Sequence, residues 1–250
     1  MAKNKTLRTR EAGALVEQVC YKRAQRTDDA KTRAEKKKRT SEVMQKYNQK
    51  TSVRKFELML AANFRPGDVV GTVTYRDDCL PEDRKAADRK FRYFRQKLAA
   101  HYKARGVELV VFWSTEHKHG DGRWHHHFIL PATGDVYGAI RAAWIYGDDI
   151  ELRPLQVDKD KNYATLAAYY AKESRERLGL RAWSYTRNAK KLVEEVDRMD
   201  DDFQLQPPKG VQVLERTSIE TPFGSFQYIK YLRPDGFVRR PYARRRRRKN

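Results

Sequence analysis

The segment GRWHHHFIL, residues 122–130, places three consecutive histidines between aromatic and aliphatic side chains. Its content of large apolar residues is typical of a β-strand, and the preceding segment VELVVFWST, residues 107–115, has the same character. Gly120-Asp121-Gly122 lies between the two segments and predicts a turn. Together they predict two antiparallel strands joined as a hairpin.

The segments on either side of this hairpin predict a mixture of strands and helices. Residues 69–75, VVGTVTY, are rich in β-branched residues and predict a strand. Apolar residues recur every three or four positions from 87 to 102, which predicts an amphipathic helix between Pro81 and Gly106. Further helices are predicted at 135–144, 162–177 and 188–199, and further strands at 150–157, 211–217 and 225–232. This order predicts an α+β fold, with an antiparallel sheet and helices packed on one face.

The composition separates a patterned centre from basic ends. Residues 1–50 contain KTRAEKKKR and few large apolar side chains, which is typical of a basic helical or disordered arm. We expect residues 51–200 to form the main domain and residues 201–243 to form a C-terminal β-hairpin extension. Residues 244–250 form a polybasic tail.

The charge of the chain indicates a polyanionic partner. Lysine and arginine number 54 against 33 acidic residues, a formal net charge of +21, and nucleic acid is the first candidate for such an excess. No apolar run approaches the roughly 20 residues of a membrane-spanning helix, and no signal-peptide core is evident. The two cysteines exclude a disulfide scaffold and a four-cysteine zinc site. We therefore expect a cytoplasmic protein that does not engage a membrane.

The three histidines differ in direction because side chains alternate faces along a strand. His125 and His127 are predicted to point the same way and His126 the opposite way. Two imidazoles about 7 Å apart on one face can bind a single divalent ion. An isolated pair of this kind can equally well pack or face solvent, so its neighbours decide between the two interpretations.

The partner strand supplies candidates for a third metal ligand. Glu116 lies at the end of this strand, and its carboxylate suits a hard ion such as Mg²⁺ or Mn²⁺. His117 and His119 are alternatives that the sequence leaves open.

The segment KNYATLAAYYAKESRE, residues 161–176, carries a possible nucleophile. On a helix, Tyr169 and Lys172 share a face because they are three residues apart. A tyrosine hydroxyl can form a covalent phosphotyrosine when a metal polarises the phosphate, and a nearby lysine can balance the charge. Tyr170 shares its face with Tyr163 and is expected to pack or to stack on a base. Aromatic packing alone would also explain the pattern.

In this order and context, the segments resemble an HUH endonuclease of the rolling-circle replication-initiator type, as found in bacterial plasmids, integrative elements and phages. The resemblance covers roughly residues 52–200. PGDVVGTVTY resembles the first motif of the family, GRWHHHFIL the histidine–hydrophobe–histidine motif, and AYYAKE the Tyr-x-x-Lys motif. The central position of the histidine motif is usually apolar but is His126 here, and Glu173 stands where some relatives carry a second tyrosine. The chain therefore looks like a one-tyrosine enzyme.

The resemblance implies an HUH or RRM-like palm that nicks and rejoins single-stranded DNA at a replication origin. His125, His127 and Glu116 would bind Mg²⁺ or Mn²⁺, Tyr169 would become linked to the 5′-phosphate, and Lys172 would balance charge. The released 3′-hydroxyl would prime a host DNA polymerase. Because the sequence shows no Walker-type phosphate loop, a host helicase would unwind the duplex.

Basic residues outside the catalytic motifs are expected to hold the DNA. WSYTRNAKKL, residues 183–192, resembles the basic segment that often follows the tyrosine motif in such initiators. The expected DNA-binding residues are Arg187, Lys190 and Lys191 in this segment, and Arg244, Arg245, Arg246, Arg247 and Arg248 in the tail.

Three other functions fit parts of the sequence. An HUH-type transposase would use the same chemistry, whereas relaxases usually carry the nucleophilic tyrosine ahead of the histidines. A non-catalytic single-stranded nucleic-acid-binding module would stack bases on aromatics and would need neither catalytic motif. A structural basic protein would explain the charged ends but not the patterned centre.

Overall fold

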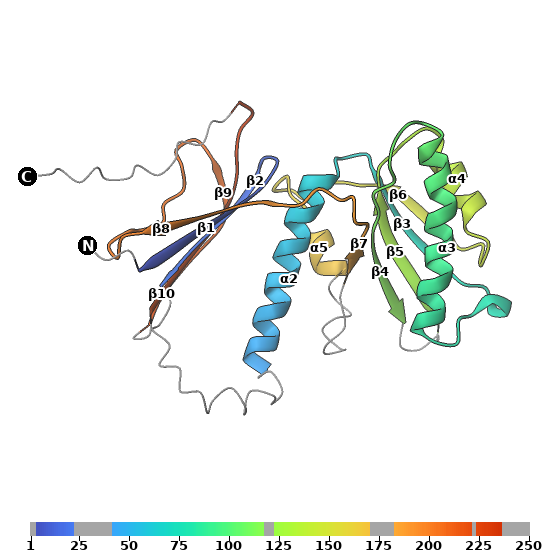
Figure 1. Cartoon of the computed structure of the whole chain (residues 1–250), viewed down its shortest axis with the longest axis horizontal. Coiled ribbons are helices and arrows are strands. Elements are labelled where there is room, and N and C mark those ends of the chain that lie inside the picture. The colour runs from blue at the N-terminus through green and yellow to red at the C-terminus, as the bar shows by residue number, and fades with distance from the viewer. Residues whose placement is uncertain (1–3, 23–41, 118–122, 171–182, 222–223, 237–250) are drawn as a thin grey trace, which may run out of the picture. The chain divides into compact units, whose positions relative to one another are not determined.

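The computed structural model describes residues 4–22, 42–117, 123–170, 183–221 and 224–236 (Figure 1). The chain divides into two compact units, a central unit (Asp28–Leu192) and a terminal unit built from both ends of the chain (Met1–Thr27 and Val193–Asn250). Each unit contains a five-stranded antiparallel sheet, and the described residues include four α-helices. The predicted α+β class is confirmed.

The sheet of the terminal unit joins segments that are almost 200 residues apart in the chain. Its strands have the order β8-β1-β2-β10-β9. They are β1 (Lys5–Ala12), β2 (Leu15–Lys22), β8 (Val193–Met199), β9 (Gln212–Thr221) and β10 (Gly224–Leu232). Leu7, Val16 and Ile229 lie in its apolar core. The predicted C-terminal hairpin is confirmed as β9 and β10, and β10 pairs in addition with β2.

Two sequence-based interpretations are wrong in this unit. The composition of residues 1–50 predicts a helical or disordered arm, but Lys5–Lys22 form the hairpin of β1 and β2. The pattern of residues 188–199 predicts a helix, but Val193–Met199 form β8, which pairs with β1. Cross-strand ion pairs accompany this pairing, including Arg10 Nε to Glu194 Oε2 at 2.7 Å. Long-range pairing therefore overrides the helical preference of the local residues.

The sheet of the central unit has β5 as its middle strand. The order is β6-β3-β5-β4-β7, with β3 (Val69–Thr74), β4 (Phe112–His117), β5 (Trp124–Leu130), β6 (Ile150–Pro154) and β7 (Ser184–Tyr185). The predicted pairing of the two segments at 107–115 and 122–130 is confirmed, because β4 and β5 are antiparallel neighbours. Gly71 of β3 lies against Phe128, and a Cβ at this position would be 2.2 Å from that ring. The glycine therefore allows β3 and β5 to pack closely.

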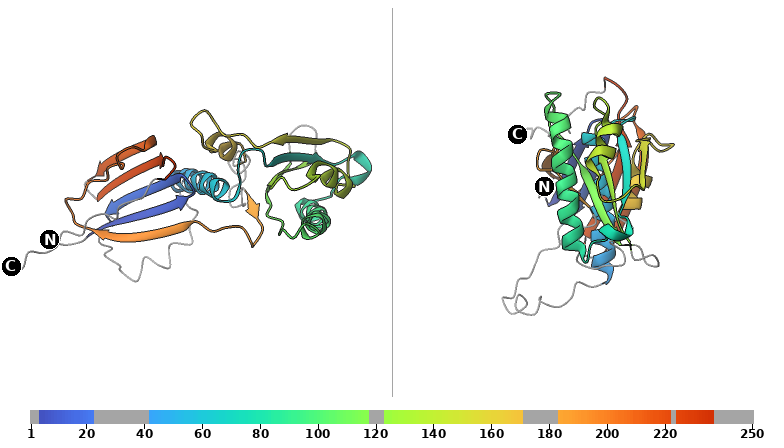
Figure 2. Two further views of the ribbon diagram at one scale, coloured as in Figure 1. Left: turned by 90° about the horizontal axis from the view of Figure 1, so that it is seen from above. Right: turned by 90° about the vertical axis from the view of Figure 1, so that its right-hand side faces the viewer.

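Helices cover both faces of this sheet (Figure 2). On one face, called the α3 face, α3 (Arg84–Lys103) and α4 (Val136–Ala143) pack over an apolar core that includes Phe94 and Phe128. On the opposite face, called the α5 face, α2 (Glu42–Asn63) and α5 (Ala164–Tyr170) pack over Phe112 and Ile129. The sequence predicts helices on one face, and the layer of α2 and α5 on the other face is an addition to that prediction.

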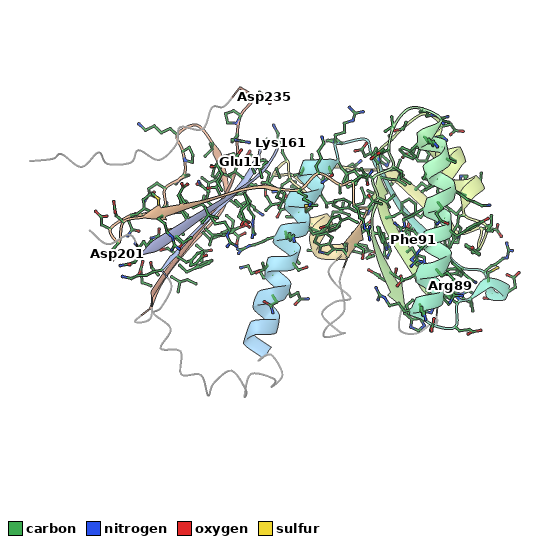
Figure 3. All side chains as sticks on the ribbon, in the orientation of Figure 1. Glu11, Arg89, Phe91, Lys161, Asp201 and Asp235 are labelled. Atoms are coloured by element: carbon green, nitrogen blue, oxygen red, sulfur yellow. The ribbon has the colours of Figure 1, made fainter. Side chains whose placement is uncertain are left out.

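The longest predicted helix matches the structure closely. Asp83 caps the N-terminus of α3 by accepting a hydrogen bond from the backbone N–H of Ala86. The five residues predicted to form its apolar face are all buried, namely Ala87, Phe91, Phe94, Leu98 and Tyr102. Phe91 lies on the sheet side of α3, whereas Arg89 is exposed (Figure 3). No helix in the described ranges is long and apolar enough to cross a membrane.

Candidate active site

The three histidines of β5 lie on two different faces, as the alternation predicts. The His126 ring stacks on Phe91 of α3 with a centroid separation of 4.5 Å. The His127 ring lies 5.4 Å from the Tyr169 ring of α5. His125 is two residues from His127 and therefore shares the α5 face with it.

His126 is a buried structural residue of the α3 face. Its side chain is fully buried, its Nε2 lies 2.7 Å from the Tyr75 hydroxyl, and its Nδ1 lies 3.1 Å from Oγ1 of Thr115. Burial, reinforced by the charge of neighbouring His127, lowers the pKa of His126 well below its ordinary value. A neutral ring with both nitrogens in hydrogen bonds fits packing rather than catalysis.

Threonines of β3 orient the other two histidines. Thr72 pairs in register with His127, and its Oγ1 lies 2.9 Å from Nδ1 of that ring. Thr74 pairs with His125 in the same way, at 3.0 Å. Metal-binding histidines usually use one ring nitrogen for such an orienting hydrogen bond and the other for the metal. Neither threonine was predicted from the sequence, although their alternate positions in VVGTVTY were a usable signal.

Glu116 completes this group from β4. It lies directly opposite His125 in the strand register, and its Oε2 is 3.0 Å from Nε2 of His127. Its side chain is buried, although carboxylates are rarely buried without a partner. Glu116 is therefore placed together with both histidines.

The two alternatives to Glu116 are located differently. His117 is the next residue of β4 and points to the opposite face, where its ring lies 4.6 Å from Trp124. Trp124 belongs to the apolar core of the α3 face. His119 lies outside the described residues. The geometry thus favours Glu116 over His117 as the partner of the two histidines.

The chemistry of this group fits a divalent ion. Two imidazoles and one carboxylate are a donor set that accepts Mn²⁺ and similar ions. In the described part of the chain, no three histidine, cysteine or acidic side chains are already gathered into a metal-binding cluster. The contact between Glu116 and His127 accounts for this, because a bound ion would take its place.

The two adjacent tyrosines of α5 have different environments. Tyr169 is 46% exposed and its ring meets that of His127 edge to face. Tyr170 is buried, with its ring 5.4 Å from that of Phe56. Tyr163 is buried in the same core as Tyr170, so the expectation that these two share a packed face is confirmed. Lys172 lies outside the described residues.

The surroundings of Tyr169 disfavour its ionised form. Partial burial is the largest cause of its raised pKa, the negative charge of Glu116 adds to it, and Arg153 opposes it. Burial raises the pKa of Tyr170 much further. At neutral pH both hydroxyls are therefore protonated, and only that of Tyr169 belongs to a solvent-accessible side chain.

The cationic residues expected to bind DNA are placed only in part. Arg187, Lys190 and Lys191 are exposed in the segment that follows β7. The backbone N–H of Lys190 donates to Oδ1 of Asn63 at 2.7 Å, which ties this segment to the end of α2. The five arginines of the tail, from 244 to 248, lie outside the described residues.

Comparison with known proteins gives one match. Residues 68–176 match the family model of the replication-associated proteins, described as ORF2 or gene 2 protein. No curated protein and no solved structure matches the chain. The matched region runs from β3 to α5 and beyond, and it includes His125, His127, Glu116 and Tyr169. The part of the chain that carries the candidate site is therefore similar to this family of replication-associated proteins.

Proposed function

We propose that this protein initiates rolling-circle replication of a phage, plasmid or integrative element by nicking and rejoining single-stranded DNA. The observation that carries the proposal is the placement of an accessible tyrosine, Tyr169, edge to face with His127, which itself contacts Glu116. The similarity of this region to replication-associated proteins supports the same conclusion.

The α5 face offers a place for the metal that such chemistry requires. His125, His127 and Glu116 would hold Mg²⁺ or Mn²⁺, with Thr72 and Thr74 fixing the rings. When bound, the ion would polarise the scissile phosphate and position it. Because these residues lie on paired strands, the sheet holds them in place before DNA arrives.

Tyr169 would supply the attacking oxygen. Its hydroxyl oxygen forms a bond to phosphorus while the bond between phosphorus and the 3′-oxygen breaks, which leaves a 5′-phosphotyrosine and a free 3′-hydroxyl. Because the pKa of Tyr169 is raised, its proton must be transferred during the attack. The carboxylates of Glu116 and Glu151 act electrostatically on this hydroxyl and are candidates to receive the proton.

Cations near the nucleophile would stabilise the transition state. Arg153 lowers the pKa of Tyr169, which means that it favours the negative charge that develops on the attacking oxygen. Lys172 would balance charge on the transferred phosphate. Positioning and electrostatics of this kind account for most phosphoryl-transfer catalysis.

The phosphotyrosine retains the energy of the broken ester, so the reaction can run backwards. Attack of a DNA 3′-hydroxyl on the phosphotyrosine would rejoin strands and release Tyr169 without ATP. A host DNA polymerase would extend the free 3′-hydroxyl, and a host helicase would supply the single strand. The partners of the proposed function are therefore single-stranded origin DNA and host replication proteins.

A strand-transfer assay tests the proposal. The protein is incubated with Mn²⁺, a labelled single-stranded oligonucleotide from the element's own intergenic region, and an unlabelled acceptor with a free 3′-hydroxyl. We expect a labelled product in which the acceptor is joined to the 3′ part of the substrate. Simple hydrolysis without any joined product would contradict the phosphotyrosine mechanism.

Two alternatives use the same surface differently. An HUH-type transposase would share every residue of this site and differ in the DNA that it cuts. A non-catalytic binding module would need neither the contact between Glu116 and His127 nor the accessible Tyr169, so it leaves both unexplained.

A further inference from the structure

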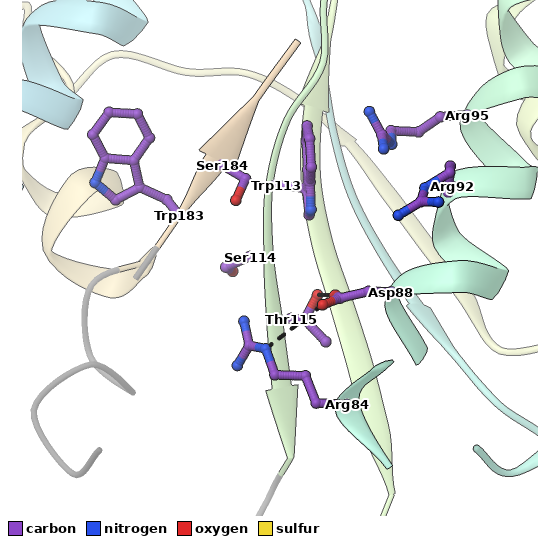
Figure 4. Close-up of a pocket in the computed structure, with 9 residues that line it drawn as sticks. All are labelled: Arg84, Asp88, Arg92, Arg95, Trp113, Ser114, Thr115, Trp183 and Ser184. Atoms are coloured by element: carbon purple, nitrogen blue, oxygen red, sulfur yellow. Dashed lines mark hydrogen bonds and ion pairs between the residues drawn. The ribbon is translucent and has the colours of Figure 1, made fainter. Parts of the chain in front are cut away.

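A pocket outside the candidate active site lies at the edge of the central sheet (Figure 4). Among the described residues, β7 pairs only with Phe112 and Trp113 of β4. Beyond this point the pocket is lined by residues 113–115 of β4, by α3, and by Trp183 and Ser184. Its volume is about 170 Å³.

Three arginines of α3 make the pocket strongly positive. Arg84, Arg92 and Arg95 line it together with a single carboxylate, Asp88. Figure 4 shows the guanidinium groups of Arg92 and Arg95 on the side of α3 that faces β4. Asp88 is already engaged, because it accepts a hydrogen bond from Thr115 at 3.0 Å and lies 3.8 Å from Arg84.

Two polar atoms at this pocket lack a hydrogen-bond partner in the described part of the chain. Ser114 is only 4% exposed, and its Oγ is buried without a partner. The Nε of Arg95 is buried without one as well. Buried polar groups are almost always hydrogen-bonded, so two orphans at one pocket indicate a missing ligand.

The position of Arg95 points to an anionic ligand. Its guanidinium carbon lies 4.0 Å from the centroid of the Trp113 ring, which fixes the group against β4. Burial is the main cause of the lowered pKa of Arg95, and the positive charge of Arg92 lowers it further. An anion between these side chains would relieve their mutual repulsion and accept their hydrogen bonds.

We infer that this pocket binds one phosphate group of the single-stranded DNA, beside the phosphate that is cut. Pockets for small-molecule ligands are usually roughly 300 Å³ or larger, so this one suits a phosphate rather than a whole nucleotide. Ser114 pairs in register with His127, and neighbouring strands are about 4.8 Å apart. A DNA strand that crosses β4 would thus reach both places. The inference rests on the proposed function for the identity of the DNA.

Arg92→Gln tests this inference, with Arg89→Gln as the matched control. Arg89 lies on the same helix and is exposed, but it does not line the pocket. Binding of a fluorescent single strand of about 20 nucleotides is measured by anisotropy in EDTA at several salt concentrations. We expect Arg92→Gln to weaken binding about tenfold and to lower the salt dependence by roughly one phosphate contact. Arg89→Gln should weaken it less than about twofold.

Two results would overturn the inference. One is an equal loss of affinity in both full-length variants, which would make Arg92 an ordinary surface charge. The other is an equally strong effect of Arg92→Gln on binding of thymidine monophosphate, which would make the pocket a nucleotide site. Neither result depends on nicking. Failure of strand transfer in the wild-type protein would contradict the proposed function while this binding comparison still stands.

Discussion

The two faces of the central sheet give the same amino acid two different roles. His126 on the α3 face is buried among aromatic rings, and both of its nitrogens have partners within the core. His127 on the α5 face contacts Glu116 and the ring of an accessible tyrosine. The residues differ by one position on one strand, so the surroundings and not the residue type decide between packing and chemistry.

The neighbours on each face show what this difference requires. On the α3 face, Phe91, Tyr75 and Trp144 surround His126 and exclude water. On the α5 face, threonine, glutamate and histidine side chains stand at alternate positions of three adjacent strands. Strands that carry polar side chains at matched register positions therefore place a reactive site inside a stable sheet.

The largest expected effect is the loss of nicking when a histidine of the α5 face is removed. His127→Ala should lower the rate of nicking about 10²-fold to 10³-fold, because a group that stabilises charge in the transition state is lost. Stability should change little, because His127 lies outside the aromatic core of the α3 face. Rates are measured on a labelled oligonucleotide with Mn²⁺. His125→Ala should behave alike.

The counterpart on the α3 face should lose stability instead. His126→Ala removes a fully buried ring and leaves the hydroxyl of Tyr75 without its closest partner, which should cost about 3 kcal/mol. Urea denaturation followed by tryptophan fluorescence measures this loss. Nicking per folded molecule should stay within a few-fold of wild type. A loss of nicking as large as that of His127→Ala in the folded variant would break the division between the faces.

Metal affinity should separate two adjacent residues of β4. Glu116→Gln should weaken binding of Mn²⁺ about a hundredfold, because a charged ligand is replaced by a neutral one. His117→Gln should have little effect, because His117 contacts Trp124 on the α3 face. Isothermal titration with Mn²⁺ measures both. If the two variants exchanged behaviour, Glu116 would not be the third ligand.

The smallest effect concerns pH and the α3 face. Burial raises the pKa of Tyr75 well above its ordinary value, so the folded protein keeps this hydroxyl protonated when the unfolded chain ionises near pH ~10. Its contribution to stability is therefore present below this pH and is lost as the pH rises further. Tyr75→Phe should be about 1 kcal/mol less stable than wild type at neutral pH. The gap should narrow above pH ~10 in urea denaturation, and a constant gap would contradict the assigned environment.

The sequence predicts the elements whose pattern is local. The amphipathic period of α3 and the alternation of β5 identify a helix, a strand and the opposite directions of His126 and His127. The hairpin of β4 and β5 follows from the short turn between them. Each of these features depends on residues close together in the chain.

The remaining features depend on contacts between distant segments. Val193–Met199 forms a strand because β1 offers it a full row of hydrogen-bonding partners, and no local pattern shows this. The pocket of Arg84, Arg92 and Arg95 likewise requires that α3 lie beside the end of β4. Thr72 and Thr74 were not predicted because the pairing of β3 with β5 was not.

Mapping the covalent adduct by peptide mass spectrometry tests the central claim most directly. The wild-type protein is reacted with single-stranded origin DNA and Mn²⁺, and the DNA-linked peptide is identified after digestion. We predict a 5′-phosphate on Tyr169, no adduct in Tyr169→Phe, and an adduct close to wild-type level in Tyr170→Phe, because Tyr170 is buried. An adduct on Tyr170 or Tyr163, or none with any divalent metal, would contradict the account.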